Sequence, residues 1–595
     1  MFQTFEAATR PEQGPPRVAA LRREMAAAGL DGFLVPRADA HQGEYVAPRD
    51  ARLAWLSGFT GSAGFCAVLG HVAGLFVDGR YRTQVKAQVA DCFTPLPWPE
   101  VTLAPWLREQ LPEGGKIGYD PWLHTAGEIA KTCALLEGSG ITLVAGENLV
   151  DRIWPDQPGP PMAPVTAHPP EFAGESSAAK RERLAGILRK AGHRAAVLTL
   201  PDSIMWLLNI RGGDIPHNPL AHGFAILHES GRVELFMAEQ KLVHLAPPLD
   251  SGVVLHEPGA LLAALTDLDG PVRIDEGSVP QIVAETLGER AVAGPDPCAL
   301  PKARKNAAEI AGSIAAHLRD GAALVETLAW IDAQAPGTIS EIDVVRRLEQ
   351  ERRKDPALRD ISFETIAGTG ANGAIIHYRV TEATNAVLDA GDLLVLDSGG
   401  QYVDGTTDVT RTIAIGSPGG EERAAFTRVL QGMIAMSRLR WPGGLAGRDI
   451  EAIGRMPLWL AGQDFGHGLG HGVGAYLCVH EGPQRLSRAS TVAIEPGMIL
   501  SNEPGYYREG AFGIRIENLL VAERSDSPGA DPAREWLSWR TLTLAPIDRR
   551  LILPEMLTEA EREWLDAYHR EVAAEIAPRV SPAARDWLAA VTAPL

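Results

Sequence analysis

Five side chains in the C-terminal half of the sequence have the chemistry to bind metal ions together. Each lies in a short motif, and the set is Asp397, Asp408, His471, Glu503 and Glu517. Four carboxylates and an imidazole make an oxygen-rich donor set, which suits two divalent ions of the manganese type better than one structural zinc. Two ions that share carboxylates can hold a bridging water, lower its pKa and polarise a carbonyl group.

The spacing of the two aspartates predicts a hairpin. Asp397 ends an apolar run that indicates a buried strand, and the Thr-, Val- and Ile-rich residues 406–415 indicate the next strand. An Asp-Gly turn signal lies between them. A hairpin centred near Tyr402 and Val403 places Asp397 directly opposite Asp408, with both side chains on one face.

The two glutamates repeat this pattern. Glu503 and Glu517 are symmetric about Gly510, which lies in a turn-like segment. Arg515 precedes Glu517 by two residues, so a strand places both side chains on the same face. The glutamates are therefore expected to meet in a second hairpin.

Glycine alternates with other residues across 466–474, and the intervening positions include His467 and His471. Such a high glycine content opposes a helix. In an extended chain one face is bare glycine and the other carries both histidines. The bare face lets another backbone or a substrate approach closely.

Each motif alone has an ordinary explanation. An aspartate before Ser-Gly is usually a turn residue, Glu-Pro-Gly is usually a loop, and a histidine among glycines is more often a loop residue than a ligand. All five residues at compatible spacings favour one shared site.

These motifs resemble the metallopeptidases of the pita-bread fold, which include methionine aminopeptidase, prolidase and aminopeptidase P, with creatinase a metal-free relative. The runs 404–412, 467–474, 503–507 and 513–518 are most similar to the large, three-domain cytosolic Xaa-Pro aminopeptidases. The resemblance implies two divalent ions per chain, with Mn²⁺ favoured and Co²⁺ or Zn²⁺ as alternatives.

The resemblance also implies a role for each residue. Asp397 binds one ion, Asp408 and Glu517 bridge both, and His471 and Glu503 complete the shell of one ion. Glu503 also shuttles a proton. Outside this ligand set, the resemblance implies an oxyanion contact from His480, substrate contacts from His377 and His467, and a carboxylate contact from Arg515 that steadies the site. His480, Glu503 and His377 are therefore the expected catalytic residues, and His377, His467, His480 and Arg515 are the expected substrate-binding residues.

The implied reaction is removal of the N-terminal residue from a peptide whose second residue is proline, by a hydroxide that the two ions activate. Two alternatives stay open. A prolidase cuts only Xaa-Pro dipeptides, and a non-catalytic pita-bread protein binds without hydrolysis. Non-catalytic relatives usually lack metal ligands, whereas all five candidate ligands are present in this sequence. The same observation disfavours creatinase-like chemistry, which needs no metal.

Composition limits the partners and the compartment. The formal net charge of −19 argues against nucleic acid and anionic membranes as partners. The N-terminal residues do not resemble a signal peptide, and no apolar run is long enough to span a bilayer. Few, scattered cysteines are expected to be buried free thiols in a reducing cytoplasm; they are Cys66, Cys92, Cys133, Cys298 and Cys478.

The chain is expected to be an α/β (α+β) protein with two similar creatinase-like α/β domains, a pita-bread catalytic domain and a helical extension. The expected boundaries are 1–155, 165–303, 304–535 and 536–595. A Pro-rich linker joins the first two domains, and a Pro- and Asp-rich break at 525–532 precedes the extension. The polar stretch 210–219 is either a surface loop or part of the active-site entrance.

Local signals predict helices around the catalytic domain. Residues 307–335 have a helical pattern, Thr338 with Glu341 reads as a capping box for the next helix, and Thr558 with Glu561 reads as another. Tryptophans in the tail indicate packing against the catalytic domain or another subunit. Together with the resemblance, they lead us to expect a homodimer.

Overall fold

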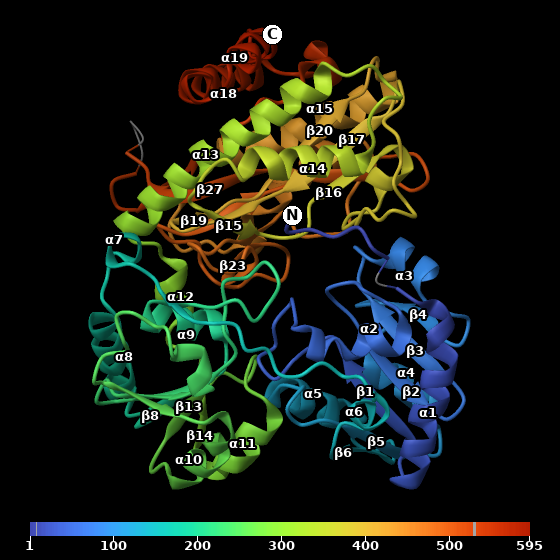
Figure 1. Cartoon of the computed structure of the whole chain (residues 1–595), viewed down its shortest axis with the longest axis vertical. Helices are drawn as coiled ribbons and strands as arrows, with labels where there is room; N and C mark the ends of the chain where they lie inside the picture. The colour runs from blue at the N-terminus through green and yellow to red at the C-terminus, as the bar shows by residue number, and fades with distance from the viewer. Residues whose placement is uncertain (8, 527–530) are drawn as a thin grey trace. The chain divides into compact units, whose positions relative to one another are not determined.

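The structure is a computed structural model, which describes residues 1–7, 9–526 and 531–595 (Figure 1). Part of the predicted break at 525–532 lies outside the described residues. The chain forms two compact units, one of residues Ala8–Ala299 and the other of Met1–Ala7 together with Leu300–Leu595.

The unit Ala8–Ala299 contains two six-stranded sheets with the same topology. Their strand orders are β4-β3-β2-β1-β5-β6 and β12-β11-β10-β8-β13-β14. The strand that comes first in the sequence, β1 in one sheet and β8 in the other, is antiparallel to one neighbour and parallel to the other. The strands are β1 (Gly32–Pro36), β2 (Phe65–Leu69), β3 (Ala73–Val77), β4 (Thr94–Pro97), β5 (Gly115–Tyr119), β6 (Ile141–Ala145), β8 (Ala195–Leu198), β10 (Phe224–His228), β11 (Val233–Phe236), β12 (Val253–His256), β13 (Val272–Ile274) and β14 (Ala291–Ala293). The predicted repeat of the two α/β domains is confirmed.

Matching turns mark the repeat in the sequence. Gly58 ends helix α2 (Arg52–Ser57) and Asn209 ends helix α9 (Pro201–Leu208), and both adopt left-handed backbone angles. Glycine adopts these angles freely and asparagine tolerates them better than most residues. The repeat therefore preserves backbone geometry where the side chains have diverged.

The Pro-rich linker is largely without regular structure. Its end forms β7 (Thr166–Ala167), which pairs with β9 (Ile210–Arg211) at the start of the polar stretch 210–219. Within that stretch, buried Asp214 accepts a hydrogen bond from Lys241 Nζ over 2.5 Å. The stretch is thus anchored within its own unit.

The other unit has two halves of similar plan. Helices α13 and α14 precede the antiparallel sheet β16-β17-β20, and helices α15 and α17 precede strands of the sheet β21-β28-β27-β24-β22-β23. The helices pack in these pairs, and in Figure 1 α13, α14 and α15 lie in front of the strands. The elements are α13 (Ala307–Asp332), α14 (Glu341–Arg352), α15 (Gly420–Ser437), α17 (Ala452–Trp459), α18 (Glu559–Ile576), α19 (Pro582–Val591), β16 (Ile366–Thr369), β17 (Leu393–Ser398), β20 (Val409–Ala414), β21 (Arg440–Pro442), β22 (Gly470–Gly472), β23 (Glu481–Leu486), β24 (Ile499–Asn502), β25 (Gly505–Arg508), β26 (Phe512–Arg515), β27 (Asn518–Arg524) and β28 (Trp536–Thr541).

The capping box predicted at Thr338 and Glu341 is wrong. Helix α14 begins at Glu341, and its capping box joins Ser340 and Asp343. Thr338 instead donates its hydroxyl to the carbonyl of Ala335. Ser340 has extended backbone angles and lies directly before the helix, so its side chain reaches the third amide of the first turn.

The tail packs on the unit that precedes it. The predicted capping box of Thr558 and Glu561 is present at the start of α18. Trp564 packs against the main hydrophobic core, and Trp587 donates from Nε1 to Asp332 of α13 over 2.9 Å. Packing against the rest of this unit therefore accounts for these tail tryptophans.

The cysteines are less buried than predicted. Cys66 and Cys298 are buried, Cys92 and Cys478 are half-buried, and Cys133 is exposed on helix α5 (Ala126–Leu136). None of the five forms a disulfide within the described part of the chain. Burial was therefore predicted correctly for two of the thiols and wrongly for Cys133.

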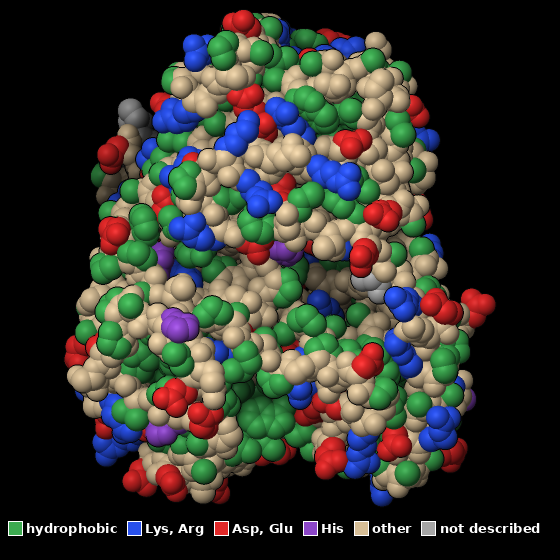
Figure 2. Space-filling view, viewed as in Figure 1, with side chains coloured by type: hydrophobic (Ala, Val, Ile, Leu, Met, Phe, Trp, Pro, Cys, Tyr) green, Lys and Arg blue, Asp and Glu red, His purple; other side chains and the backbone are tan. Residues whose placement is uncertain are grey.

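The surface shows no concentration of positive charge on the face drawn in Figure 2. Acidic and basic side chains are interspersed across that face. Among the described residues, every helix is too short or too polar to cross a membrane.

Candidate metal centre

The two candidate aspartates lie on one hairpin, in a register that differs from the prediction. Strand β17 pairs with β20 so that Asp397 is opposite Thr410, and Asp408 is diagonal to Asp397. The hairpin closes with Tyr402 opposite Gly405, one residue later than expected. This shifts the pairing by two residues, and because side chains alternate with a period of two, the shift leaves both aspartates on the same face.

The two candidate glutamates lie opposite each other, as predicted. The β24–β27 ladder ends with Asn502 opposite Asn518, and the β25–β26 ladder continues the same register about Gly510. Glu503 and Glu517 occupy the position between the two ladders. One shared register therefore brings together two carboxylates that belong to different motifs.

The glycines of the histidine run allow close approach of the backbone, as predicted. In β22, a Cβ atom at Gly470 would collide with the carbonyl oxygen of Ser501, and one at Gly472 would collide with that of Glu481. Glycine is therefore required on both sides of His471. The tight packing of β22 between β23 and β24 fixes the position of the imidazole.

The imidazole of His471 faces the carboxylates. Its Nδ1 lies 2.9 Å from the carbonyl oxygen of Gly472, and because a carbonyl can only accept, Nδ1 carries the proton. Its Nε2 lies 3.4 Å from Oδ2 of Asp408 and 3.6 Å from Oε1 of Glu503. Donor atoms of Asp408, His471 and Glu517 all lie within 4.8 Å of one another.

Arg515 makes the expected contact with a carboxylate. Its Nη2 donates to Oδ2 of Asp397 over 2.7 Å, and its Nε donates to the hydroxyl of Thr410 over 3.2 Å. Thr410 in turn donates to Oε2 of Glu517 over 2.8 Å. The other oxygen of Asp397 is buried and has no hydrogen-bond partner within the described residues.

The electrostatics of the site call for a cation. Burial raises the pKa of Asp408 well above its usual value, and the charges of Asp397 and Glu503 add to the rise. Burial, followed by the charge of Asp408, does the same to the pKa of Glu517. Burial and then Glu517 raise the pKa of Glu503 to about 7. Clustered buried carboxylates need protons or cations, so the donor set fits divalent metal ions.

Two further candidate histidines lie beside this set. The ring of His480 lies 4.3 Å from that of His471, centroid to centroid, in an edge-on arrangement. His467 pairs through Nε2 with the hydroxyl of Tyr507 over 3.0 Å, and its Nδ1 lies 4.0 Å from Oε2 of Glu503. The structure therefore brings both histidines to the candidate ligands.

His377 is placed less directly. It is half-buried in the turn that follows the short helix η6 (Gly370–Ala374). That helix contacts β17 and β26, the strands that carry Asp397 and Arg515. The contact places the turn next to strands of the site.

Three hydroxyl groups with no role predicted from the sequence support the candidate ligands or Arg515. One is the Thr410 hydroxyl described above. Ser501 accepts from the amide of His471 and donates to Glu503, over 2.9 and 3.3 Å. Tyr507 accepts from Nη1 of Arg515 over 2.7 Å. A signal existed for Thr410, which lies two residues after Asp408 in a predicted strand.

The sequence is similar to curated proteins over nearly its whole length. The probable Xaa-Pro aminopeptidase P of Aspergillus fumigatus (strain Af293) is 38% identical over 585 residues, covering 93% of this chain and 88% of the relative. The corresponding protein of Coccidioides posadasii is 39% identical over 598 residues, covering 96% and 91%. The chain belongs to metallopeptidase family M24. The family model for metallopeptidase family M24 matches residues 312–524. A second model, for the C-terminal region of peptidase M24, matches residues 535–595.

Two models of a creatinase/prolidase N-terminal domain match residues 17–153 and 156–309 of the M24 chain. Among solved structures, X-prolyl aminopeptidase from Caenorhabditis elegans, a cytosolic enzyme with a di-nuclear active site, has a TM-score of 0.92 and 32% identity, covering 98% of this chain and 100% of that one. Xaa-Pro dipeptidase from Bacillus anthracis shares the fold over 64% of this chain and 100% of its own, with 24% identity and a TM-score of 0.50. The predicted fold class is confirmed.

Proposed function

We propose that this M24 protein is a metal-dependent aminopeptidase that removes the N-terminal residue from peptides with proline at the second position. The observation that carries the proposal is the convergence of Asp397, Asp408, His471, Glu503 and Glu517 at one buried site. Support for the substrate class comes from relatives named Xaa-Pro aminopeptidase P, which match over nearly the whole chain.

These five residues would hold two divalent ions. Their oxygen-rich composition favours Mn²⁺, with Co²⁺ and Zn²⁺ as alternatives. When bound, such ions supply a water of lowered pKa and polarise the scissile carbonyl. Within the chain, the hydrogen bond from Arg515 fixes one oxygen of Asp397 and leaves the other for an ion. The hydroxyl of Thr410 orients Glu517 in the same way.

In this proposal, Glu503 accepts a proton from the attacking water and returns it to the substrate. Its pKa of about 7 lies near neutral pH, where a carboxylate can both accept and return a proton. His480 donates a hydrogen bond to the oxyanion that develops on the substrate, from its position beside His471. His467, which pairs with Tyr507, and His377 contact the peptide.

A tripeptide separates this proposal from a prolidase. We expect the protein to cleave Ala-Pro-Ala into Ala and Pro-Ala when supplied with Mn²⁺. Cleavage of Ala-Pro with no cleavage of Ala-Pro-Ala would identify a prolidase. Binding of either peptide without products, at full metal loading, would identify a non-catalytic binding protein.

The proposal includes a homodimer. Three apolar side chains, Met456, Trp459 and Leu460, are exposed at the end of α17. Exposed apolar residues that gather in one place are typical of interaction surfaces. Sedimentation at micromolar concentration should show a species of twice 63.7 kDa; a monomer alone would contradict the dimer.

We also propose a cytoplasmic location and the four domain boundaries 1–155, 165–303, 304–535 and 536–595. The location is supported by the cysteines, which form no disulfide within the described residues, as suits a reducing compartment. Four separate family matches support four domains near these boundaries. Strand β28, at the start of the fourth, pairs with β21 and β27 of the preceding domain, so the extension is not helical throughout. The residues Met1–Ala7 pack with the catalytic unit, where the amide of Phe2 donates to Glu349 over 2.8 Å.

A further inference from the structure

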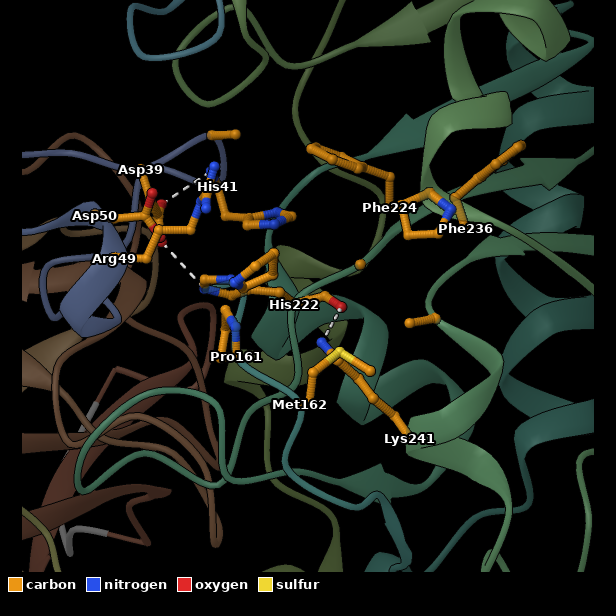
Figure 3. Close-up of a pocket in the computed structure, with 15 residues that line it drawn as sticks. Asp39, His41, Arg49, Asp50, Pro161, Met162, His222, Phe224, Phe236 and Lys241 are labelled. Atoms are coloured by element: carbon orange, nitrogen blue, oxygen red, sulfur yellow. Dashed lines mark hydrogen bonds and ion pairs between the residues drawn. The ribbon is translucent and has the colours of Figure 1, made fainter. Parts of the chain in front are cut away.

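The unit Ala8–Ala299 contains a cavity of ≈ 220 Å³ that is lined by residues of both α/β repeats (Figure 3). Asp39 and Asp50 reach it from the first repeat, and His222 reaches it from the second. One donor atom from each of these three side chains lies within 4.8 Å of the other two. Two carboxylates and an imidazole therefore converge at one wall of the cavity.

The carboxylate of Asp39 is held with one oxygen directed at His222. Its Oδ1 accepts hydrogen bonds from the amides of His41 and Gly43, over 2.9 and 3.1 Å. Its Oδ2 lies 3.2 Å from Nε2 of His222. Both of these atoms are buried, and neither has a hydrogen-bond partner among the residues that the structure describes. Asp39 itself is only 1% exposed, and a buried polar oxygen without a partner is destabilising.

The separation of these two atoms matches a shared metal ion. Zinc-ligand distances of about 2.1 Å place neighbouring ligand atoms about 3.0–3.4 Å apart in octahedral or tetrahedral geometry. The observed 3.2 Å falls within this range. The alternative is an ion pair between Asp39 and a protonated His222, although their two facing atoms do not form a hydrogen bond.

Neighbouring groups hold the backbone of His222 and the side chain of Asp50 before any ion binds. The amide of His222 donates to Asp214 over 2.7 Å, and its carbonyl accepts from Lys241 Nζ over 3.2 Å. Arg52 donates from Nη1 to Oδ1 of Asp50 over 2.9 Å. Such supporting contacts orient the ligands of metal sites and raise their affinity.

We propose that Asp39, Asp50 and His222 bind a divalent transition-metal ion of the zinc class that joins the two α/β repeats. The imidazole argues against Ca²⁺ and Mg²⁺, which prefer oxygen ligands alone. Water molecules in the cavity complete the coordination. An ion that binds only the folded unit also stabilises it against unfolding.

The test is the number of Zn²⁺ ions bound by the full-length protein. The chelator-treated wild type and the His222→Ala variant are dialysed against the same free Zn²⁺, and metal and protein are then measured. We expect wild type to bind one ion more per chain than His222→Ala. The matched control is His193→Ala, which removes a histidine of the same repeat that accepts from Arg273 instead. It should bind as many ions as wild type.

A second variant, Asp50→Asn, tests the same site in case His222→Ala does not fold. Asp50→Asn keeps the oxygen that accepts from Arg52 and removes the charge. It should lose the same ion, or bind it at least about 10-fold more weakly. Equal Zn²⁺ binding by wild type and by either folded variant would overturn the proposal. Because each comparison is a difference, its result does not depend on how many ions the M24 centre holds.

Discussion

Arg515 donates from Nη2 to Oδ2 of Asp397 over 2.7 Å, and both side chains are buried. The same guanidinium donates to Tyr507, whose hydroxyl pairs with His467. A chain of four side chains thus links a candidate metal ligand to a candidate substrate contact. The ion pair fixes one oxygen of Asp397 and leaves the other directed at the site.

Replacing Arg515 should weaken metal binding without removing a ligand. Lysine cannot reach Asp397, Thr410 and Tyr507 together as the forked guanidinium does. We expect Arg515→Lys to bind Mn²⁺ about 10–100-fold more weakly, as is typical for groups that orient ligands. A binding isotherm measures the effect, with exposed Arg508→Ala as the control. Wild-type affinity in Arg515→Lys would show that the ion pair has no part in metal binding.

His480 and His471 should respond differently to removal. The two rings lie edge-on, 4.3 Å apart between centroids, and Nε2 of His471 lies 3.4 and 3.6 Å from carboxylate oxygens of Asp408 and Glu503. We expect His480→Ala to keep both ions and lose about 10²–10³-fold in kcat, the usual effect of removing one oxyanion donor. His471→Ala should lose metal itself. Metal analysis beside turnover of Ala-Pro-Ala distinguishes them; a metal-depleted or fully active His480→Ala would refute the assignment.

The stability of the metal-free protein should depend on pH through Glu503. Burial and then Glu517 raise its pKa from the usual 4.5 to about 7, so between these values the folded chain holds a proton that the unfolded chain has lost. Its contribution to the free energy of unfolding is therefore complete below pH 4.5 and is lost as the pH rises through about 7.

Glu503→Gln is the matched variant, because the neutral amide imitates the protonated acid. Denaturation in the presence of a chelator should show wild type losing stability relative to the variant between pH 4.5 and 7.5. A constant difference between the two proteins across that window would mean that the pKa of Glu503 is not raised.

The unit that contains Leu300–Leu595 should lose stability in mild acid because of His569. The amide of Ile547 donates to its Nε2 over 3.1 Å, so the buried ring must be neutral. Burial, followed by Arg411 and Arg549, lowers its pKa to about 3 from 6.5. Its contribution is complete above pH 6.5 and is lost as the pH falls towards 3, since only the unfolded chain takes up the proton.

His569→Gln keeps an acceptor for Ile547 and cannot be protonated in this range. Its denaturation midpoint should therefore change less between pH 7.5 and pH 5 than that of wild type. The same change in both proteins would exclude His569 as the source of the acid sensitivity.

Sequence spacing predicted the glutamate pair better than the aspartate pair, for a physical reason. Glu503 and Glu517 are flanked by two ladders in one register about Gly510, so symmetry alone locates them. The aspartate hairpin depends on where a short turn closes, and the actual turn is one residue later than the expected one. The error left both aspartates on the correct face because strand side chains alternate.

Contacts between motifs could not be predicted from the sequence. Asp397 and Arg515 meet because the two hairpins pack against each other, which no local pattern encodes. The same holds for the cavity cluster, where Asp39 and His222 belong to different repeats of similar topology. Local signals locate turns and caps, but tertiary packing selects the partners.

The most direct test of the central claim is to titrate metal-free protein with Mn²⁺ while following the cleavage of Ala-Pro-Ala. The M24 centre is proposed to need two ions, held by Asp397, Asp408, His471, Glu503 and Glu517. We predict no cleavage in the metal-free protein and a rise to full activity as two ions bind to that centre, with Ala and Pro-Ala as the products. Full activity in protein that metal analysis shows to be metal-free would contradict the account.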